Sequence, residues 1–93
     1  MTIRNFKHKG LKKFFETGNK SGIQAAHAFK IELILDRLDA AGDLKDMIFP
    51  GSDFHPLKGK LKNYYSVHVN GNWTVIFRFD KGEAIDVDLV DYH

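Results

Sequence analysis

The chain has 93 residues, of which 43% are hydrophobic and 28% are charged. This composition is typical of a globular protein and excludes a disordered one. No cysteine is present, which disfavours a disulfide-stapled secreted domain and favours a reducing cytoplasm. No apolar run approaches the roughly 20 residues of a membrane span, and the first residues lack the apolar stretch of a signal peptide. We therefore expect a single cytoplasmic domain over residues 1–93, with no membrane association.

The net charge is only +2, but the charges are distributed unevenly. Basic side chains dominate residues 1–20 and return as Lys58, Lys60 and Lys62, whereas residues 80–91 are mainly acidic. The basic segments favour a polyanionic partner such as RNA. The alternative is an ordinary solvated surface, because lysine-rich helices are common on globular proteins.

The first predicted elements are a short strand over residues 2–6 and a short helix. Leu11, Phe14 and Phe15 stand at positions i, i+3 and i+4, which is typical of an amphipathic helix with lysines on its other face. Gly18 is expected to end this helix.

The main helix is predicted to begin at Ser21, because Gln24 follows three residues later at the spacing of a capping box. Gly42 is its expected stop. A further helical turn is expected over residues 43–47, and a loop over residues 50–53. The apolar stripe of the main helix consists of Ile23, Ile31, Ile34, Leu35, Leu38 and Ala41.

From residue 54 onward the pattern predicts strands. Residues 64–69 and 73–79 flank Asn70-Gly71, and Asn-Gly between two such runs is a strong hairpin signal. With Asn70-Gly71 as a two-residue loop, Val69 faces Asn72 and His68 faces Trp73. One face then carries Trp73, Val75, Phe77 and Phe79 of the second strand with Tyr64, Ser66 and His68, and this face is expected to meet the helices. The other face carries Tyr65, Val67, Val69, Asn72, Thr74, Ile76 and Arg78.

A turn at Lys81-Gly82 leads into the last strand, where Ile85, Val87 and Leu89 alternate with acidic residues. Helices first and an antiparallel meander afterwards indicate an α+β domain. Strict alternation along the last strand would place Asp91 and His93 on one side and Tyr92 on the other.

Two clusters carry side chains suited to acid–base chemistry. The first is the ending Asp91-Tyr92-His93, in which a carboxylate, a phenol and an imidazole follow a strand. The second is His55-Pro56-Leu57-Lys58-Gly59, which adds an imidazole and a cation. Simpler interpretations stay open: a terminal residue without a role for His93, a strand-edge turn at His55-Pro56, and a packed imidazole at His68.

Several motifs, taken together and in order, resemble the HigB branch of the RelE toxin superfamily. They are Phe6-Lys7-His8-Lys9-Gly10-Leu11, His55-Pro56-Leu57-Lys58-Gly59, Asn70-Gly71-Asn72-Trp73 and the terminal Val90-Asp91-Tyr92-His93. The resemblance covers essentially the whole chain. It implies an α+β fold, the RelE-like microbial RNase fold, with two N-terminal helices packed on one face of a small twisted antiparallel sheet.

The resemblance also implies a function. Such toxins enter the ribosomal A site and cut the mRNA there, driving the ribose 2′-OH onto the adjacent phosphate without a metal or other cofactor. The implied partners are the ribosome and its mRNA, and a HigA-like helix-turn-helix antitoxin that neutralises the toxin. Operator DNA would be bound only through the complex with the antitoxin.

The family's site residues carry over to matching positions. His93 is the best general acid or base, Asp91 can fix its tautomer or raise its pKa, and Tyr92 can stack on a base or donate a proton. Lys58 is the expected phosphate cation, with His55 as a second imidazole. The RNA- or phosphate-binding set comprises Asn72, Arg78, Thr74 and Lys60.

One departure concerns positive charge. The family usually has an arginine after Asn-Trp, where this chain has Thr74, and often another arginine where this chain has Val67-His68-Val69. Threonine has no charge to offer a phosphate, and Arg78 is the expected substitute on the same face. Three interpretations stay open: a site rearranged around Arg78 and Lys58, a weak toxin, or an attenuated sequence. The second functional class is therefore an inactive toxin homologue that acts as an antitoxin- or RNA-binding module.

A metal site is the remaining alternative, because the chain has five histidines. Their positions (His8, His27, His55, His68 and His93) include no i, i+4 pair, and there is no CxxC partner. We therefore expect no metal.

Overall fold

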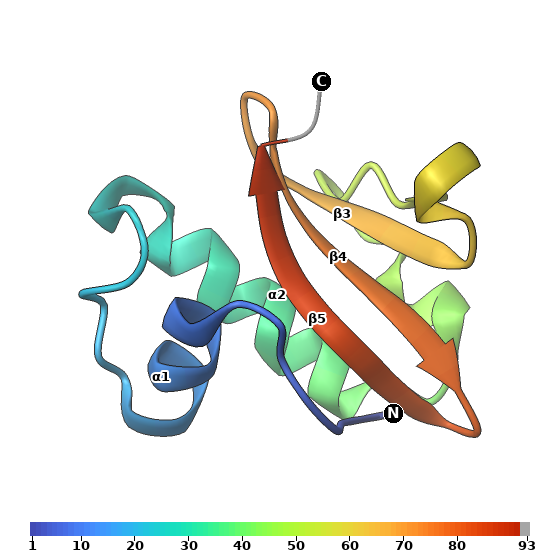
Figure 1. Ribbon diagram of the computed structural model, residues 1–93, viewed down its shortest axis with the longest axis horizontal. Coiled ribbons are helices and arrows are strands. Elements are labelled where there is room, and N and C mark those ends of the chain that lie inside the picture. Colours follow the sequence, from blue (N-terminus) through green and yellow to red (C-terminus); the bar gives the residue numbers. More distant parts are fainter. Residues whose placement is uncertain (92–93) are drawn as a thin grey trace.

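The computed structural model describes residues 1–91 of the chain, and Tyr92 and His93 lie outside the described residues. Figure 1 shows two helices beside a twisted sheet. The helices are α1 (Lys9–Thr17) and α2 (Ala28–Ala40), and short 3₁₀ turns form η1 (Ala25–His27), η2 (Leu44–Met47) and η3 (Gly59–Leu61). The strands are β1 (Thr2–Ile3), β2 (His55–Pro56), β3 (Tyr64–Asn70), β4 (Trp73–Asp80) and β5 (Glu83–Asp91).

Helix α1 forms where its apolar spacing predicts it, with Leu11 and Phe14 buried. His8 caps its start, since the ring Nδ1 accepts a hydrogen bond from the backbone N–H of Leu11 at 3.0 Å. Gly18 ends it in the left-handed conformation (φ 79°), with its N–H bonded to the carbonyl of Phe14. The predicted helix and its stop are therefore confirmed.

The start of the main helix was predicted wrongly. α2 begins at Ala28, and Gln24 precedes only the 3₁₀ turn η1, without a side-chain capping bond. The chain before α2 is pressed against the start of α1: a Cβ added to Gly22 would lie 2.5 Å from the Cα of Gly10. This backbone contact holds the segment out of the helix. The predicted end is right, because α2 stops at Ala40 and its apolar stripe is buried from residue 31 to residue 38.

The expected helical turn over residues 43–47 is present as η2. Asp43 accepts a hydrogen bond from the N–H of Lys45, and the Asp46 carboxylate reaches back to the N–H groups of Gly42 and Asp43, which completes a capping box. These backbone hydrogen bonds lower the pKa of the Asp46 carboxyl. The predicted capping chemistry thus occurs in this chain, but at Asp43 and not at Ser21.

The sheet has five strands in the order β1-β5-β4-β3-β2. The meander β2 to β5 is antiparallel, whereas β1 runs parallel to β5, with Thr2 opposite Glu83 and Ile3 opposite Ala84. The α+β class is confirmed, and the expectation of a purely antiparallel sheet is wrong. The reason is the N-terminal segment, which continues along β5 as far as a bridge between Phe6 and Val87.

The hairpin register was also predicted wrongly. Asn70 pairs with Trp73, so the loop is Gly71-Asn72, and a bulge at Val69 then brings His68 opposite Thr74. Gly71 has a positive φ (57°) and Asn72 does not; a type I′ turn on Asn-Gly needs two such residues, whereas a type II′ turn needs one at its first position. The shift by one residue exchanges the two faces of β3.

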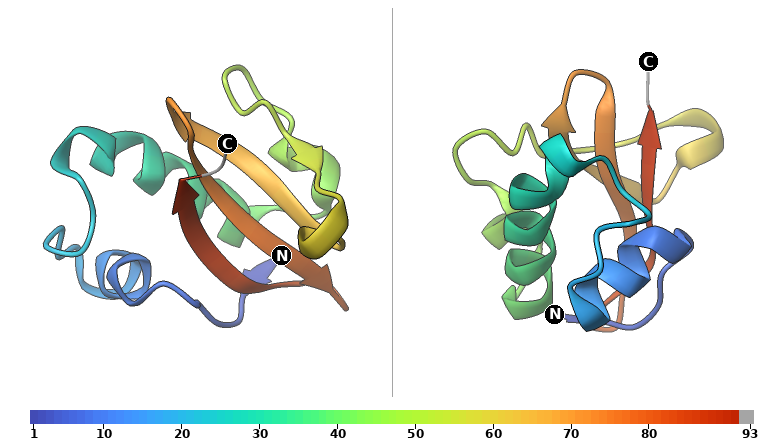
Figure 2. Two further views of the ribbon diagram at one scale, coloured as in Figure 1. Left: turned by 45° about the horizontal axis from the view of Figure 1, so that its top comes forward. Right: turned by 90° about the vertical axis from the view of Figure 1, so that its left-hand side faces the viewer.

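The two sheet faces follow from this register. On one face, Val67, Val75 and Phe77 join Leu11 and Ile31 of the helices in a buried core cluster, and Figure 2 shows α1 and α2 beside this face. We call the opposite side the outer face. There Ile76, Tyr64 and Leu57 form a second, smaller buried cluster with Leu61 and Val90 packed against it. Trp73, Val75, Phe77 and Phe79 lie toward the helices as predicted, but they are joined there by Tyr65, Val67 and Val69 and not by Tyr64, Ser66 and His68.

A second bulge interrupts β5. The pairing of β5 with β4 shifts its register between Ile76 and Arg78 of β4, and Asp86 adopts a positive φ of 53°. Ala84 and not Ile85 is therefore buried in the core, together with Val87 and Leu89. The strict alternation expected from Ile85 onward is thus wrong at its first residue, because the bulge adds one position.

Candidate active site

The strand pairings arrange the candidate residues in rows across the outer face. Cross-strand partners in a sheet project to the same side. The row nearest the β3–β4 hairpin consists of Val90, Thr74 and His68, and the next row consists of Asp88, Ile76, Ser66 and His55. Thr74 therefore lies between a histidine on one neighbouring strand and the end of β5 on the other.

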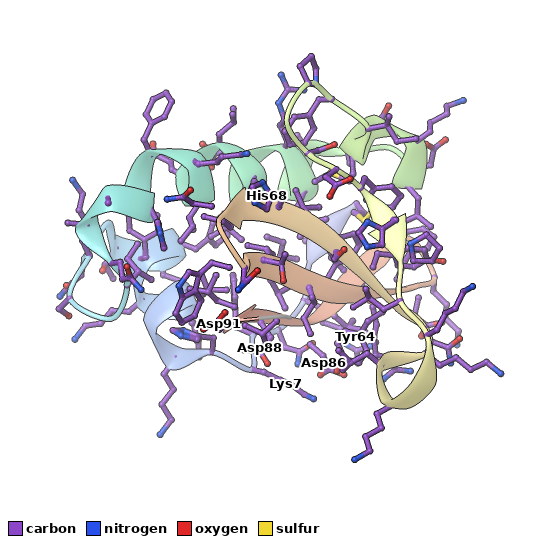
Figure 3. All side chains as sticks on the ribbon, turned by 90° about the horizontal axis from the view of Figure 1, so that it is seen from above. Lys7, Tyr64, His68, Asp86, Asp88 and Asp91 are labelled. Carbon is purple, nitrogen blue, oxygen red and sulfur yellow. The ribbon has the colours of Figure 1, made fainter. Side chains whose placement is uncertain are left out.

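The end of β5 is the best-defined part of the site. Val90 pairs with Thr74, and Asp91 pairs with Trp73, so β5 stays in the sheet up to the last described residue. Figure 3 shows Asp91 and His68 at the end of the sheet that carries the hairpin. The expectation of a strand-held ending is confirmed as far as Asp91. The predicted roles of Tyr92 and His93 fall on residues outside the described part.

His55 is held in a single tautomer by its neighbours. Its Nδ1 lies 2.9 Å from the carbonyl oxygen of Asp53, and since a carbonyl only accepts, Nδ1 carries the proton. In the neutral ring Nε2 is then an acceptor, and it lies 3.4 Å from the hydroxyl of Ser66. His55 is exposed, so it presents a basic ring nitrogen on the outer face.

His68 is engaged by the hairpin turn. Its Nε2 lies 3.0 Å from the carbonyl oxygen of Gly71, which makes Nε2 the donor and leaves Nδ1 as the acceptor of the neutral ring. His68 is half-buried. The expectation of a packed imidazole is therefore supported, although His68 lies opposite Thr74 and not opposite Trp73.

Thr74, the position at which the resemblance implied an arginine, is half-buried. Its hydroxyl is buried and finds no hydrogen-bond partner among the described residues. Asn72 is exposed in the adjacent turn. The site thus has a hydroxyl and an amide at the hairpin, and no cation from this strand end.

The lysines of the second cluster are exposed but anchored. Lys58 immediately precedes η3, and Lys60 lies within it. On either side, Leu57 packs into the outer-face cluster and Leu61 packs against it. The two leucines hold the segment on the sheet, while the ammonium groups stay in solvent as mobile point charges.

Arg78 lies on the same face as Thr74, as expected, but it is engaged elsewhere. Its Nη1 lies 3.2 Å from Oδ2 of Asp86, in an ion pair and hydrogen bond. Asn5 donates to the other carboxylate oxygen at 2.9 Å. The hydrogen bond from Asn5, followed by Arg78 and the charge of Lys7, lowers the pKa of the Asp86 carboxyl. Four positions along β4 separate Arg78 from Thr74, which is about 13 Å in a strand.

One further residue of this region, Lys7, was not predicted from the sequence. Lys7 lies over the ring of Tyr64, with Nζ 5.4 Å from the ring centroid. The hydroxyl of Tyr64, and then the carboxylates of Asp86 and Asp88, raise the pKa of the Lys7 ammonium. Figure 3 shows these four residues along one side of the sheet. Only the parallel pairing of the N-terminal segment with β5 brings Lys7 here, and no local pattern indicated that pairing.

The structure therefore divides the candidate residues into three groups. Asp91, Asn72 and Thr74 lie at the hairpin end of the sheet, where Asp91 shares the helix-side face with its partner Trp73 and Thr74 lies on the outer face, and His55 with the two lysines lies along the β2 edge. Arg78 belongs to the opposite end of β4. Within residues 1–91, no group of three or more His, Asp or Glu side chains is arranged to hold a metal ion. No helix in that range is both long and apolar enough to cross a membrane.

Solved structures with this arrangement define the fold. A copper-bound mutant toxin from Helicobacter pylori matches with a TM-score of 0.55 at 24% identity, over 96% of this chain and 92% of the other. A conserved hypothetical protein from the same organism matches with a TM-score of 0.54 at 23% identity, over the same shares of the two chains. The fold is thus shared with these two Helicobacter pylori proteins.

The family follows from closer relatives. The model of the HigB toxin family, described as RelE-like toxins of type II toxin–antitoxin systems, matches residues 4–93. The chain is 38% identical over 91 residues to the endoribonuclease HigB of Proteus vulgaris, covering 98% of this chain and 99% of the relative. It is 37% identical over 89 residues to the toxin HigB-1 of Vibrio cholerae, covering 90% of each. The chain belongs to the HigB-like family of endoribonuclease toxins, which confirms the resemblance; such a system implies an antitoxin partner.

Proposed function

We propose that this chain is a ribosome-dependent endoribonuclease that cleaves mRNA in the A site and thereby inhibits translation in the cytoplasm. A HigA-like helix-turn-helix antitoxin neutralises it, and operator DNA is bound only through that complex. The observation that carries the proposal is the end of β5. It remains paired through Asp91, which lies opposite Trp73 at the hairpin, so the sequence Asp91-Tyr92-His93 starts from a paired strand end.

The proposed reaction needs no metal ion. A general base removes the proton from the ribose 2′-OH, whose oxygen attacks the adjacent phosphorus. The bond from phosphorus to the 5′-oxygen breaks, and a general acid gives that oxygen a proton, so a 2′,3′-cyclic phosphate and a 5′-OH result. His93 is the proposed acid or base, positioned by Asp91, with Tyr92 as a stacking group or proton donor. His55, whose Nε2 is an acceptor, is the second imidazole.

RNA binding draws on groups along two strands and the β2 edge. Lys58 is the proposed phosphate cation, and Lys60 adds charge nearby. Asn72 is exposed in the hairpin turn, where an amide can orient a sugar or a base edge. Thr74 contributes its unpaired hydroxyl only if the groups that bury it move. Arg78 contributes only if its ion pair with Asp86 opens.

The test is induction in bacterial cells with mapping of transcript 5′ ends. We expect growth arrest and cuts at in-frame codon positions in translated messages. His93→Ala is expected to abolish both, and its antitoxin binding serves as the control that it is folded. Unchanged growth with intact messages for the unaltered chain contradicts the proposal.

The second candidate is an attenuated toxin that binds its antitoxin or RNA without efficient cleavage. It is favoured by the uncharged Thr74, where the resemblance implies an arginine, and by the pairing of Arg78 on this face with Asp86. Such a module retains antitoxin binding but leaves messages intact. The same experiment distinguishes it, because antitoxin binding without cuts is its expected result.

A further inference from the structure

A pocket outside the proposed catalytic groups lies on the helix side of the sheet, at the hairpin end. Its volume is about 280 Å³, slightly below the roughly 300–1,000 Å³ of pockets for drug-sized ligands. It therefore has room for one planar ring system. The pocket is lined by His8, Ser21, Gly22, Ile23, Gln24, His27, Trp73 and Leu89.

His27 is the residue that marks this pocket as a binding site. His27 is only 5% exposed, and its Nδ1 is buried with no hydrogen-bond partner among the described residues. The ring lies 6.1 Å from that of Trp73, centroid to centroid, at an interplanar angle of 55°. Because buried polar atoms in native proteins are nearly always paired, this nitrogen is an unused hydrogen-bonding group on a residue that lines the pocket, and a small rotation of the ring would present it to a bound group.

His8 supplies a second polar group of defined character. Its Nδ1 accepts the hydrogen bond from Leu11 that caps α1, so in the neutral ring Nε2 carries the proton and donates. Gln24 and Ser21 add an amide and a hydroxyl, both exposed. The lining thus combines an indole and apolar side chains with donors and acceptors, and it contains no lysine, arginine or carboxylate.

The pocket adjoins the proposed cleavage site. Trp73 pairs with Asp91, and Leu89 lies two positions before Asp91 on the same strand. Trp73 also stands between Asn72 and Thr74 in the chain. The pocket opens on the helix side and the other candidate groups lie on the outer face, so a nucleotide next to the phosphate that is cut would reach the pocket around the hairpin end of the sheet.

We propose that this pocket binds a nucleobase of the substrate RNA, stacked on Trp73 with its polar edge against His27 and His8. The inference rests on the proposed function, because it adds a base contact to the same site. Bases have flat faces that stack on aromatic side chains and edges that pair with neutral polar groups. The lining residues carry no charge that could pair with a charged side chain of a partner protein. A neutral nucleobase is therefore favoured over such a side chain as the occupant of the pocket.

Trp73 is the only tryptophan in the chain, so its fluorescence reports on this pocket directly. Adenosine 5′-monophosphate and, separately, ribose 5-phosphate are titrated into the purified full chain. We expect saturable quenching by adenosine monophosphate and none by the sugar phosphate. Equal responses to both probes, or none to either, overturn the inference, as does a Trp73 signal that changes only when antitoxin is added.

Two variants test the assigned contacts. His27→Phe keeps a ring but removes both nitrogens, and is expected to weaken adenosine monophosphate binding about tenfold, the effect of losing one buried hydrogen bond. Gln24→Ala, at an exposed position that does not threaten folding, is expected to weaken it two- to threefold. Glu32→Gln, on the solvent side of α2 and outside this pocket, is the matched control and leaves the affinity unchanged. Unchanged affinity in both pocket variants contradicts the assignment.

A cleavage assay on translating ribosomes separates this inference from the proposed function. We expect His27→Phe to alter the base preference at one position beside the cut, whereas His93→Ala removes cleavage and leaves quenching intact. Quenching by a chain that never cuts RNA supports the pocket and contradicts the proposed reaction. Cleavage with an unaltered base preference in His27→Phe, together with absent quenching, contradicts the pocket alone.

Discussion

Arg78 and Asp86 face each other across the β4–β5 pair, with Nη1 and Oδ2 3.2 Å apart, at the bulge where Asp86 has a positive φ. This ion pair engages Arg78, the residue that was expected to replace a phosphate-binding arginine at position 74. Asp86 also receives a hydrogen bond from Asn5, which connects the N-terminal segment to β5. Arg78, which was expected to bind RNA, thus links two strands of the sheet.

Asp86→Asn is expected to lower stability by about 1 kcal/mol at pH 7, because the charge-assisted bonds to Asn5 and Arg78 are weakened. The carboxyl has a pKa lowered by folding, so its contribution is present above the unfolded pKa of about 3.9 and is lost as the pH falls through the folded pKa. Urea unfolding at pH 7 and at pH 3 measures this. We expect the difference between the two proteins to be smaller at pH 3 than at pH 7; an equal difference at both pH values contradicts the linkage.

Thr74→Arg is expected to raise mRNA cleavage by roughly 10²–10³, the usual effect of one group that stabilises transition-state charge. Thr74 is half-buried between Val90 and His68, and the long arginine stem can follow the surface while its head reaches solvent. Mapping of transcript 5′ ends at matched expression levels measures the effect. Thr74→Gln, which is long but uncharged, is the control; an equal gain there shows that charge is not what this position lacks.

Lys58→Ala is expected to reduce cleavage about 100-fold if its ammonium meets the phosphate. The fold is expected to survive, because Leu57 and Leu61 anchor the segment and Lys58 itself is exposed. Lys60→Ala removes the same charge from within η3 and serves as the matched control, with a loss of less than tenfold. Similar losses in both variants indicate a diffuse electrostatic contribution in place of a specific contact.

Gly22→Ala is expected to destabilise the chain by about 3 kcal/mol, since the new methyl group would lie 2.5 Å from the Cα of Gly10 and the backbone on both sides must move. Gly42→Ala is the control, because its added Cβ meets only the end of the Asp46 side chain at 3.4 Å. Denaturant titration of the two variants gives the comparison. A loss below 1 kcal/mol for Gly22→Ala shows that the contact between α1 and the chain before α2 is loose.

The elements that depend on neighbouring residues in the sequence were predicted correctly. The spacing of Leu11 and Phe14 and the stop at Gly18 give α1 correctly, and the stripe of α2 is buried as expected. The failures come from tertiary contacts. The packing of Gly22 on Gly10 outweighs the capping signal at Ser21. A bulge at Val69 exchanges the faces of β3, and no residue pattern within β3 indicated it.

The candidate site shows the same division. The placement of Asp91 at a paired strand end followed from the alternating pattern of β5. The engagement of Arg78 by Asp86 did not, because it depends on a bulge and on Asn5, which is 81 positions distant in sequence from Asp86. Lys7 was overlooked for the same reason, since only β1 and the Phe6–Val87 bridge bring it to the outer face.

The parallel pairing of β1 with β5 also constrains when the molecule can assemble. Residues 2–3 find their partners only at residues 83–84, so closing this contact joins segments about 80 residues apart and costs chain entropy. The β3–β4 hairpin, by contrast, joins neighbouring segments. Strand β5 lies between β1 and β4 in the sheet, so a nascent chain that lacks β5 can form the β3–β4 hairpin but not the complete sheet. The candidate site, which includes Asp91 at the end of β5, therefore forms only after β5 has been synthesised.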